Sequence, residues 1–177
     1  MRFKRAFFAY IYHYNDKLYG DDNLIKLKPL VISIAIPLLV GGLSSFISRG
    51  GFAGYAAVSQ PAFAPPAWLF PIVWTILYIL MGISCYMIYV TRHPLRDEAL
   101  KIYAAQLAVN FLWPILFFVL NGFFISFLWL ILLDMLIAAM IMVFFRIKPL
   151  AGLLQLPYLT WCIFASVLNF SIWLLNR

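Results

Sequence analysis

Long uncharged stretches dominate the chain and recur five times along it. Between Gly50 and Thr91 no residue is charged, and between Tyr103 and Phe145 the only charged residue is Asp134. Helical runs of this length and polarity cross the roughly 30 Å hydrocarbon layer of a bilayer. We therefore predict five transmembrane helices, at Leu30–Ile47, Trp68–Val90, Ile102–Leu120, Phe123–Phe145 and Leu150–Leu175.

Short polar or helix-breaking segments separate these runs. The links at Asn121-Gly122 and Arg146–Pro149 are so brief that the helices on either side of each must be antiparallel neighbours. The expected fold is an all-α membrane protein, a single bundle of five transmembrane helices over residues 29–177, after a basic N-terminal tail at residues 1–28.

Composition and charge support a membrane location. Hydrophobic residues make up 66% of the chain and charged residues 11%, a composition that excludes a water-facing surface on a domain of 177 residues. Of the 13 Lys and Arg residues, only Arg49 and Arg177 fall on the side of the membrane opposite the N-terminus. By the positive-inside rule we expect a bacterial cytoplasmic membrane protein with its N-terminus inside and its C-terminus outside. The loop from Ser48 to Ala67 is then external.

The tail has two interpretations. Phe3, Phe7, Tyr10 and Tyr14 recur at helical spacing beside basic residues, as in an amphipathic helix lying on an anionic membrane surface. The alternative is a basic tail that only fixes the topology. The net charge of +7 is in either case a membrane signal, and nothing pairs it with a nucleic-acid-binding fold.

Conventional catalytic and metal-binding patterns are missing from the sequence. Cys85 and Cys162 fall inside predicted helices, whereas His13 and His93 fall outside them, so metal-ligand spacing is absent. No phosphate-binding loop or nucleophile–base pair occurs either. We expect neither a hydrolase nor a metalloenzyme, and no obligatory cofactor.

Aromatic and amide side chains form stripes on three of the predicted helices. These are Trp74, Tyr78 and Met81 on the second, Gln106, Asn110, Trp113 and Phe117 on the third, and Trp161, Ala165, Leu168 and Asn169 on the fifth. Membrane tryptophans often form an interfacial belt, which suits Trp68, Trp129 and Trp173. The amides must face the protein interior, because a polar group in hydrocarbon needs a partner. They serve either as interhelical contacts or as contacts to a ligand.

Asp134 is the most unusual residue of the predicted spans. A carboxylate at the middle of a span costs roughly 2.5–3.5 kcal/mol on insertion scales, so it should face the bundle or a water-filled cavity, or stay protonated. A functional site and a structural polar pair are both open. Small-xxx-small pairs, Ala104 with Ala108 and Gly41 with Ser45, suit either a dimer interface or internal packing.

The polar and aromatic residues occur in blocks that resemble the TspO/MBR family of tryptophan-rich sensory and translocator proteins. The resemblance runs from about Leu30 to Asn176, and four blocks in the family's order and spacing carry it. They are Gln60-Pro61, PPAWLFPIVWTILYILMG at residues 65–82, QLAVNFLW at residues 106–113 and PYLTWCIFASVLNFSIW at residues 157–173.

The resemblance implies a five-helix bundle, commonly a homodimer, with a ligand pocket roofed by the first loop. Family members bind protoporphyrin IX and other tetrapyrroles, sterols in some branches, and synthetic isoquinoline carboxamides and benzodiazepines. The matching ligand-binding positions are Pro65, Pro66, Trp68, Trp74, Tyr78, Asn110, Trp113, Trp161, Ala165, Leu168 and Asn169. The sterol pattern is broken, because Phe170 stands where it requires Tyr and Arg177 is too distant.

Three functions follow as hypotheses. The first is a membrane protein that binds tetrapyrroles or similar hydrophobic ligands, acting in porphyrin sensing, transport or regulation. The second is an enzyme that degrades porphyrin with light and oxygen, for which the resemblance implies catalytic roles for Trp74 and Trp161. The third is a transporter or structural membrane partner without a porphyrin ligand, for which Asp134 is the best feature.

Overall fold

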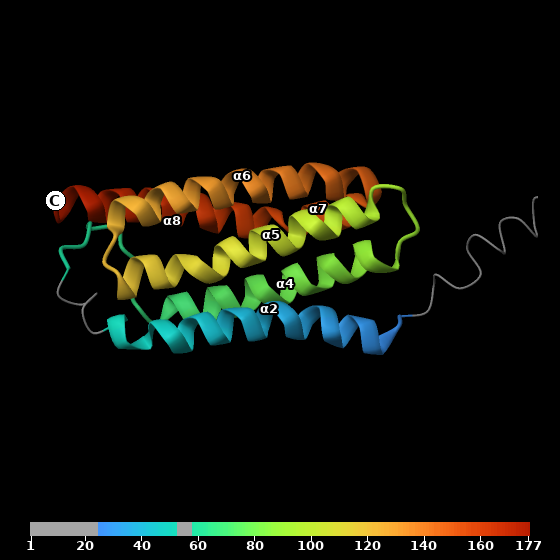
Figure 1. The fold of residues 1–177 in the computed structure, drawn as a ribbon, viewed down its shortest axis with the longest axis horizontal. Coiled ribbons are helices and arrows are strands. Elements are labelled where there is room, and N and C mark those ends of the chain that lie inside the picture. Colours follow the sequence, from blue (N-terminus) through green and yellow to red (C-terminus); the bar gives the residue numbers. More distant parts are fainter. Residues whose placement is uncertain (1–24, 53–57) are drawn as a thin grey trace, which may run out of the picture.

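The helices of this computed structural model, which describes residues 25–52 and 58–177, form one bundle (Figure 1). The amphipathic tail helix suggested for residues 3–14 lies outside the described residues. The helical elements are α2 (Leu27–Ser48) with the 3-10 turn η1 (Arg49–Gly51), α4 (Leu69–Val90), α5 (Arg96–Pro114) with the π-helical turn η2 (Ile115–Val119), α6 (Phe123–Ile147), α7 (Pro149–Leu153) and α8 (Leu156–Leu175).

In the part of the chain that the structure describes, five helical segments are long and apolar enough to span a membrane, which confirms the predicted number: α2 with η1, α4, α5 with η2, α6, and α7 with α8. The third was placed too late, because α5 begins at Arg96 and not at Ile102. Its first turn carries Asp97 and Glu98, and acidic side chains stabilise a helix N-terminus. The fifth is interrupted after Leu153, so α7 is a short helix of its own.

The helices pack in sequence-adjacent and cross-bundle pairs. α2 lies along α4, α6 lies along α8, and α5 contacts α2, α4 and α6 (Figure 1). The turn between η2 and α6 is as tight as predicted: Asn121 adopts a left-handed conformation at φ 52°, which Asn tolerates better than most residues. Ser84 on α4 donates a hydrogen bond of 2.7 Å to the carbonyl of Ala151, which ties α7 to α4.

The buried face of α2 consists of small residues. Its buried positions are Ser33, Pro37, Gly41, Ser44 and Ser48, and only 17% of its most apolar window is covered by protein. Gly82 on α4 lies against this face, since a Cβ placed there would come within 2.5 Å of the Ile34 Cα atom. Side chains of this size allow two helix backbones to approach closely in lipid.

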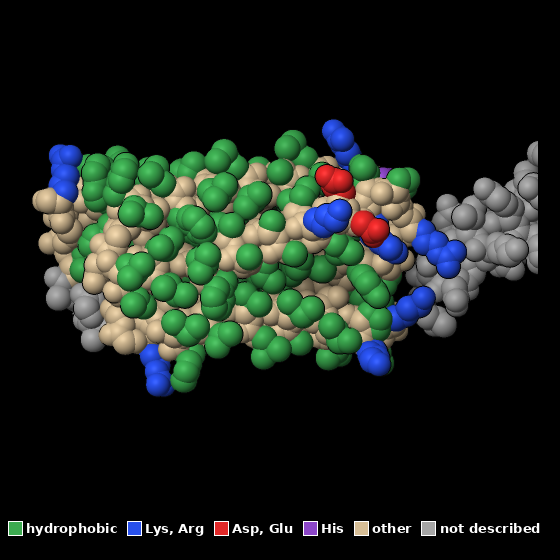
Figure 2. Space-filling model, in the orientation of Figure 1, with side chains coloured by type: hydrophobic (Ala, Val, Ile, Leu, Met, Phe, Trp, Pro, Cys, Tyr) green, Lys and Arg blue, Asp and Glu red, His purple; other side chains and the backbone are tan. Residues whose placement is uncertain are grey.

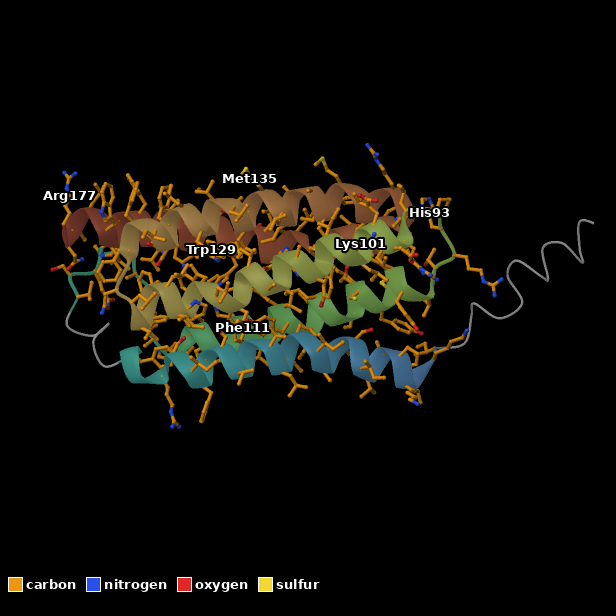
Figure 3. The ribbon with its side chains drawn as sticks, viewed as in Figure 1. His93, Lys101, Phe111, Trp129, Met135 and Arg177 are labelled. Carbon is orange, nitrogen blue, oxygen red and sulfur yellow. The ribbon has the colours of Figure 1, made fainter. Side chains whose placement is uncertain are left out.

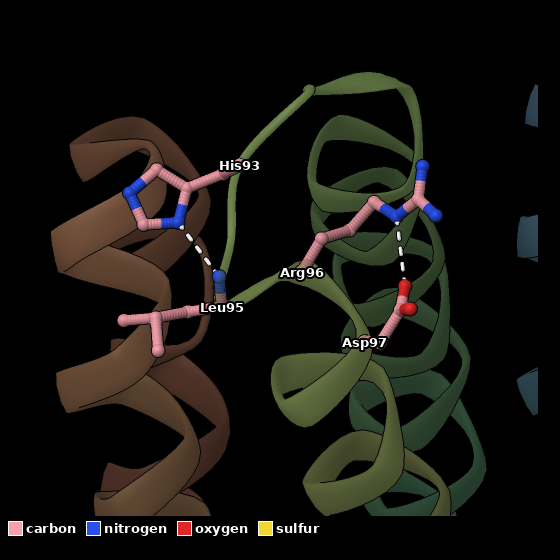
Figure 4. Close-up of polar contacts among 4 residues, drawn as sticks. All are labelled: His93, Leu95, Arg96 and Asp97. Atoms are coloured by element: carbon pink, nitrogen blue, oxygen red, sulfur yellow. Dashed lines mark hydrogen bonds and ion pairs between the residues drawn. The ribbon is translucent and has the colours of Figure 1, made fainter.

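The two ends of the bundle differ in charge. The Lys and Arg side chains visible in Figure 2 gather mostly at the end where α2 begins, and apolar side chains cover the middle. At that end the turn before α5 is held by His93, whose Nδ1 accepts a hydrogen bond of 3.1 Å from the Leu95 amide (Figure 4). Arg96 and Asp97 form an exposed ion pair at 3.0 Å, the kind that contributes little stability. The orientation of the two ends in a membrane stays a prediction of the positive-inside rule.

Gly82→Ala tests the close approach of α2 and α4. The new methyl group would meet backbone atoms of Ser33 and Ile34, which have little room to yield, so we expect the free energy of unfolding to fall by roughly 1–3 kcal/mol. The measurement is an SDS unfolding titration of the detergent-solubilised protein. Gly42→Ala is the matched control, because a Cβ there has nothing within 4 Å. Equal stability of the two variants would contradict the proposed contact.

Candidate ligand cavity

A cavity of about 520 Å³ lies between α2, α4, the end of α5 with η2, and α8. Its lining residues come from all four segments, and most of them are apolar. Volumes of roughly 300–1,000 Å³ are typical of sites for small organic ligands. The cavity is therefore of the size and character of a ligand pocket.

The cavity exists because small side chains of α2 face large rings of the other helices. α2 contributes Gly41, Gly42 and Ser45 to the wall. Opposite them, Trp74 and Tyr78 of α4 have ring centroids 5.4 Å apart. A Cβ on Gly41 would overlap the Tyr78 ring, so the tyrosine occupies the space that a larger α2 residue would take.

Aromatic rings of α5 and η2 form the adjoining wall. Trp113 and Phe117 stack at 5.3 Å with an interplanar angle of 26°. Phe118 meets Phe117 edge-on at 4.9 Å. Pro114, at the end of α5, precedes the π-helical turn that holds both phenylalanines. Flat aromatic surfaces of this kind favour stacked or edge-on contact with another ring system.

Buried hydrogen bonds centred on Asn110 connect the helices around the cavity. The Tyr78 hydroxyl donates to Asn110 Oδ1 at 3.0 Å, and Asn110 Nδ2 donates to the Tyr158 hydroxyl at 3.0 Å. Tyr158 in turn donates to Gln106 Oε1 at 2.8 Å. This chain joins α4, α5 and α8, and it leaves Asn110 and Tyr78 as polar contacts on an otherwise apolar wall.

Asn169 forms a second polar contact on the α8 side. The Asn169 amide is oriented with its oxygen toward the indole of Trp113. In this orientation Oδ1 accepts a hydrogen bond from Trp113 Nε1 at 3.2 Å, and Nδ2 donates one to the Phe123 carbonyl at 2.8 Å. Asn110 and Asn169 are 3% and 1% exposed, which confirms the prediction that both amides face the interior. Each forms interhelical contacts and also lines the cavity.

The structure brings seven of the eleven sequence-predicted residues to this cavity: Trp74, Tyr78, Asn110, Trp113, Ala165, Leu168 and Asn169. Pro65, Pro66 and Trp68 do not line it. Pro66 instead accepts a hydrogen bond from the Leu69 amide at the start of α4, and Trp68 is 64% exposed, as expected of an interfacial tryptophan.

Trp161 also lies outside the cavity. It faces a shallow apolar groove between α4 and α8 that Val73, Leu77 and Phe164 also line. Its ring contacts Phe70, which does line the cavity, at a centroid distance of 5.8 Å. Trp161 therefore adjoins the cavity through one intervening ring.

Sequence reasoning missed several lining or supporting residues. Gly42, Phe70 and Phe118 carry no polar group and belong to no stripe, so no signal separated them from ordinary apolar residues. Tyr158 had a signal, because it is a hydroxyl-bearing ring inside a predicted span and must find a partner there. It is fully buried and bonds two of the predicted polar residues.

Asp134 does not reach the cavity. Its Oδ2 accepts a hydrogen bond of 2.8 Å from Ser166, which places the carboxyl between α6 and α8. Trp129 on the same helix donates to the Val109 carbonyl at 2.8 Å and so turns toward α5, whereas Met135 points outward (Figure 3). Asp134 is thus part of a structural polar pair. Within residues 25–52 and 58–177, no three His, Cys, Asp or Glu side chains are grouped as metal ligands.

The side chain of Asn176 fastens the loop before α4 to the end of α8. Asn176 Oδ1 accepts from the Ser59 amide at 3.0 Å, and its Nδ2 donates to the Ser59 carbonyl at 2.9 Å. Phe63 of the loop contacts Phe164 of α8 edge-on at 6.4 Å. The described part of the loop is therefore held over α8 at the cavity end of the bundle.

Comparison with known proteins places the chain in a family. The model of the TspO/MBR family matches residues 33–174. The tryptophan-rich protein TspO of Archaeoglobus fulgidus is 39% identical over 155 residues, covering 87% of this chain and 99% of that protein. The translocator protein of Bos taurus is 37% identical over 84% of this chain and 90% of its own length. Protein CrtK of Rhodobacter capsulatus is 38% identical over 77% of this chain and 85% of its own. With its five membrane-spanning helices and this match along most of its length, the chain belongs to the TspO/MBR family.

Proposed function

We propose that this membrane protein binds a flat, largely apolar ligand of the tetrapyrrole class, such as protoporphyrin IX, in sensing, transport or regulation of porphyrins. The observation that carries the proposal is the cavity of about 520 Å³ walled by the rings of Trp74, Tyr78, Trp113 and Phe117. A macrocycle gains most from such a wall, because ring faces and apolar area both favour it.

Energetics support binding in this cavity. Burying about 300 Å² of apolar ligand surface is worth on the order of 7 kcal/mol before the costs of association. The polar contacts at Asn110 and Asn169 would orient the ligand and add less to its affinity. Micromolar affinity is the expected result.

Ala165→Leu tests the cavity as the binding site. Ala165 is 6% exposed and lines the cavity, so the larger side chain would occupy ligand space and weaken binding by about tenfold or more. The measurement is quenching of tryptophan fluorescence by protoporphyrin IX in darkness. Val167→Leu, on the exposed face of the same helix, is the matched control and should bind like the parent protein. Equal affinity of both variants, with equal thermal stability, would place the ligand elsewhere.

A second candidate function is degradation of bound porphyrin by light and oxygen. The position of Trp74 favours it, because this indole lines the cavity directly. Trp161 is separated from the cavity by Phe70 and would act only through that ring or after a rearrangement.

Illumination of the porphyrin-bound protein in air tests this activity. If Trp74 reacts with the excited ligand, Trp74→Phe should suppress formation of a new absorption band more strongly than Trp161→Phe does, because only Trp74 can touch the ligand. Product is followed by absorption spectroscopy at equal ligand occupancy. Equal bleaching by the parent and by the double variant would show photochemistry that does not involve either indole.

We also propose that the protein forms a homodimer through α5. Ala104, Ala105 and Ala108 are exposed on one face of this helix, so the small-residue pair predicted there is not used for packing within the chain. Small residues at such a face permit close helix approach between copies.

Ala108→Trp tests this interface. A bulky ring on the alanine face should prevent close approach of two α5 helices and shift the protein from dimer to monomer. Sedimentation velocity in detergent measures the change. Met135→Trp is the control, because Met135 points outward from α6 and is 59% exposed. A parent protein that sediments as a monomer, or an Ala108→Trp dimer, would contradict the proposal.

A further inference from the structure

We propose that the cavity opens sideways between α2 and α4, so that ligands reach it from within the bilayer and not from water across the external loop. The inference rests on the proposed function only for the identity of the ligand. It assigns to Gly42, Ser45, Pro71 and Thr75 the role of a lateral mouth.

Exposure of the lining residues locates the mouth. The deep wall consists of buried residues of α5 and α8, among them Asn110, Trp113, Leu168 and Asn169. In contrast, Gly42 and Ser45 on α2 and Pro71 and Thr75 on α4 line the cavity and are exposed at the surface of the bundle. A residue that lines a cavity and also meets the surroundings lies at its opening. All four lie on the neighbouring helices α2 and α4 and line the same cavity.

The spacing of α2 and α4 explains why the opening lies there. Near Gly82 the backbones approach so closely that a Cβ would come within 2.5 Å of Ile34 Cα. Seven residues further along α2, at Gly41, the Tyr78 ring fills the gap between the helices. At the next residue, Gly42, a Cβ would meet nothing within 4 Å. The Tyr78 ring thus closes the space between the helices at Gly41, whereas Gly42 lines the cavity and has open space at its Cβ position.

The depth and chemistry of the mouth suit hydrocarbon. α4 starts at Leu69, so Thr75 lies about 9 Å along a helix that is long enough to span the bilayer. The Thr75 hydroxyl donates to the Pro71 carbonyl of its own helix at 2.7 Å, so it needs no water. Among the described residues, none that lines the cavity is charged.

The exposed lining residues Phe52 and Ala67 at the ends of the external loop define the competing route from water. On that route a ligand would pass beneath the loop, which Asn176 fastens through its two hydrogen bonds to Ser59. The two routes therefore respond to different substitutions. Gly42→Phe would obstruct the lateral mouth, and Asn176→Ala would release the loop.

A spin label at Ala165→Cys tests the opening without any porphyrin. Both native cysteines, Cys85 and Cys162, are replaced by alanine, and the labelled protein is studied in lipid nanodiscs by power-saturation EPR. Oxygen, which concentrates in lipid, should collide with the label, whereas a water-soluble nickel chelate should not. Gly42→Phe and Ser45→Leu should each lower the oxygen collision rate, because both plug the mouth. Leu43→Phe, an exposed α2 position outside the cavity, is the matched control.

Stopped-flow binding of protoporphyrin IX then measures the route itself. Obstruction of the mouth should slow both association and dissociation by about tenfold, since a gate alters both rates. Asn176→Ala should leave both rates unchanged.

The outcomes separate this inference from the proposed function. Three results would overturn the lateral mouth. In the first, the label collides more often with the nickel chelate than with oxygen; in the second, it collides with neither. In the third, the binding rates rise in Asn176→Ala and do not fall in Gly42→Phe. Lack of porphyrin binding together with the expected oxygen pattern would refute the ligand assignment and leave the mouth in place.

Discussion

The need to satisfy every polar group inside a hydrocarbon layer shapes this protein more than any other constraint. Asn110 is buried inside the bundle, and the partners of its amide come from two other helices. The chain from Tyr78 through Asn110 and Tyr158 to Gln106 fixes the relative positions of α4, α5 and α8. Directional bonds of this kind hold the helices at a defined separation, and a cavity between them can persist because they cannot collapse freely.

The second requirement is an asymmetry of side-chain size. A bundle in which every helix carried large residues inward would fill its own interior, because protein cores pack to near-crystal density. The buried positions of α2 are Ser, Gly and Pro residues, and although Leu38 also lines the cavity, aromatic rings of the other helices form most of its wall. The resulting space is bounded by rings that cannot reach across it. The buried stripe of α2 lies against α4 near Gly82 and borders the cavity at Gly41, so contact and cavity arise from one stripe.

Periodicity and polarity in the sequence predict much of this arrangement. The length of the uncharged runs is enough to identify the five spans. The free-energy cost of exposing an amide to lipid is enough to predict that Asn110 and Asn169 face inward. The start of α5 was missed because its first turns are charged and lie beyond the apolar run, although Asp97 and Glu98 are themselves helix-start signals. The break between α7 and α8 was also missed, since apolar composition continues across it. Trp161 shows the limit of helical spacing, because sharing a face with Ala165 over one turn does not ensure that both reach the same space.

The position of Trp161 also bears on how the cavity wall works. Phe70 lies between this indole and the cavity, in contact with it at 5.8 Å, so a ligand would touch Phe70 and would be separated from Trp161 by one ring. Trp74 lines the cavity directly. The centroid of its ring lies 5.4 Å from that of Tyr78 and 6.2 Å from that of Tyr158. The two tryptophans that the sequence motif treats as equivalent therefore differ in position: Trp74 lines the cavity, and Trp161 packs against a lining ring. Substituting Trp161 should accordingly act through the packing of Phe70, whereas substituting Trp74 removes a contact surface itself.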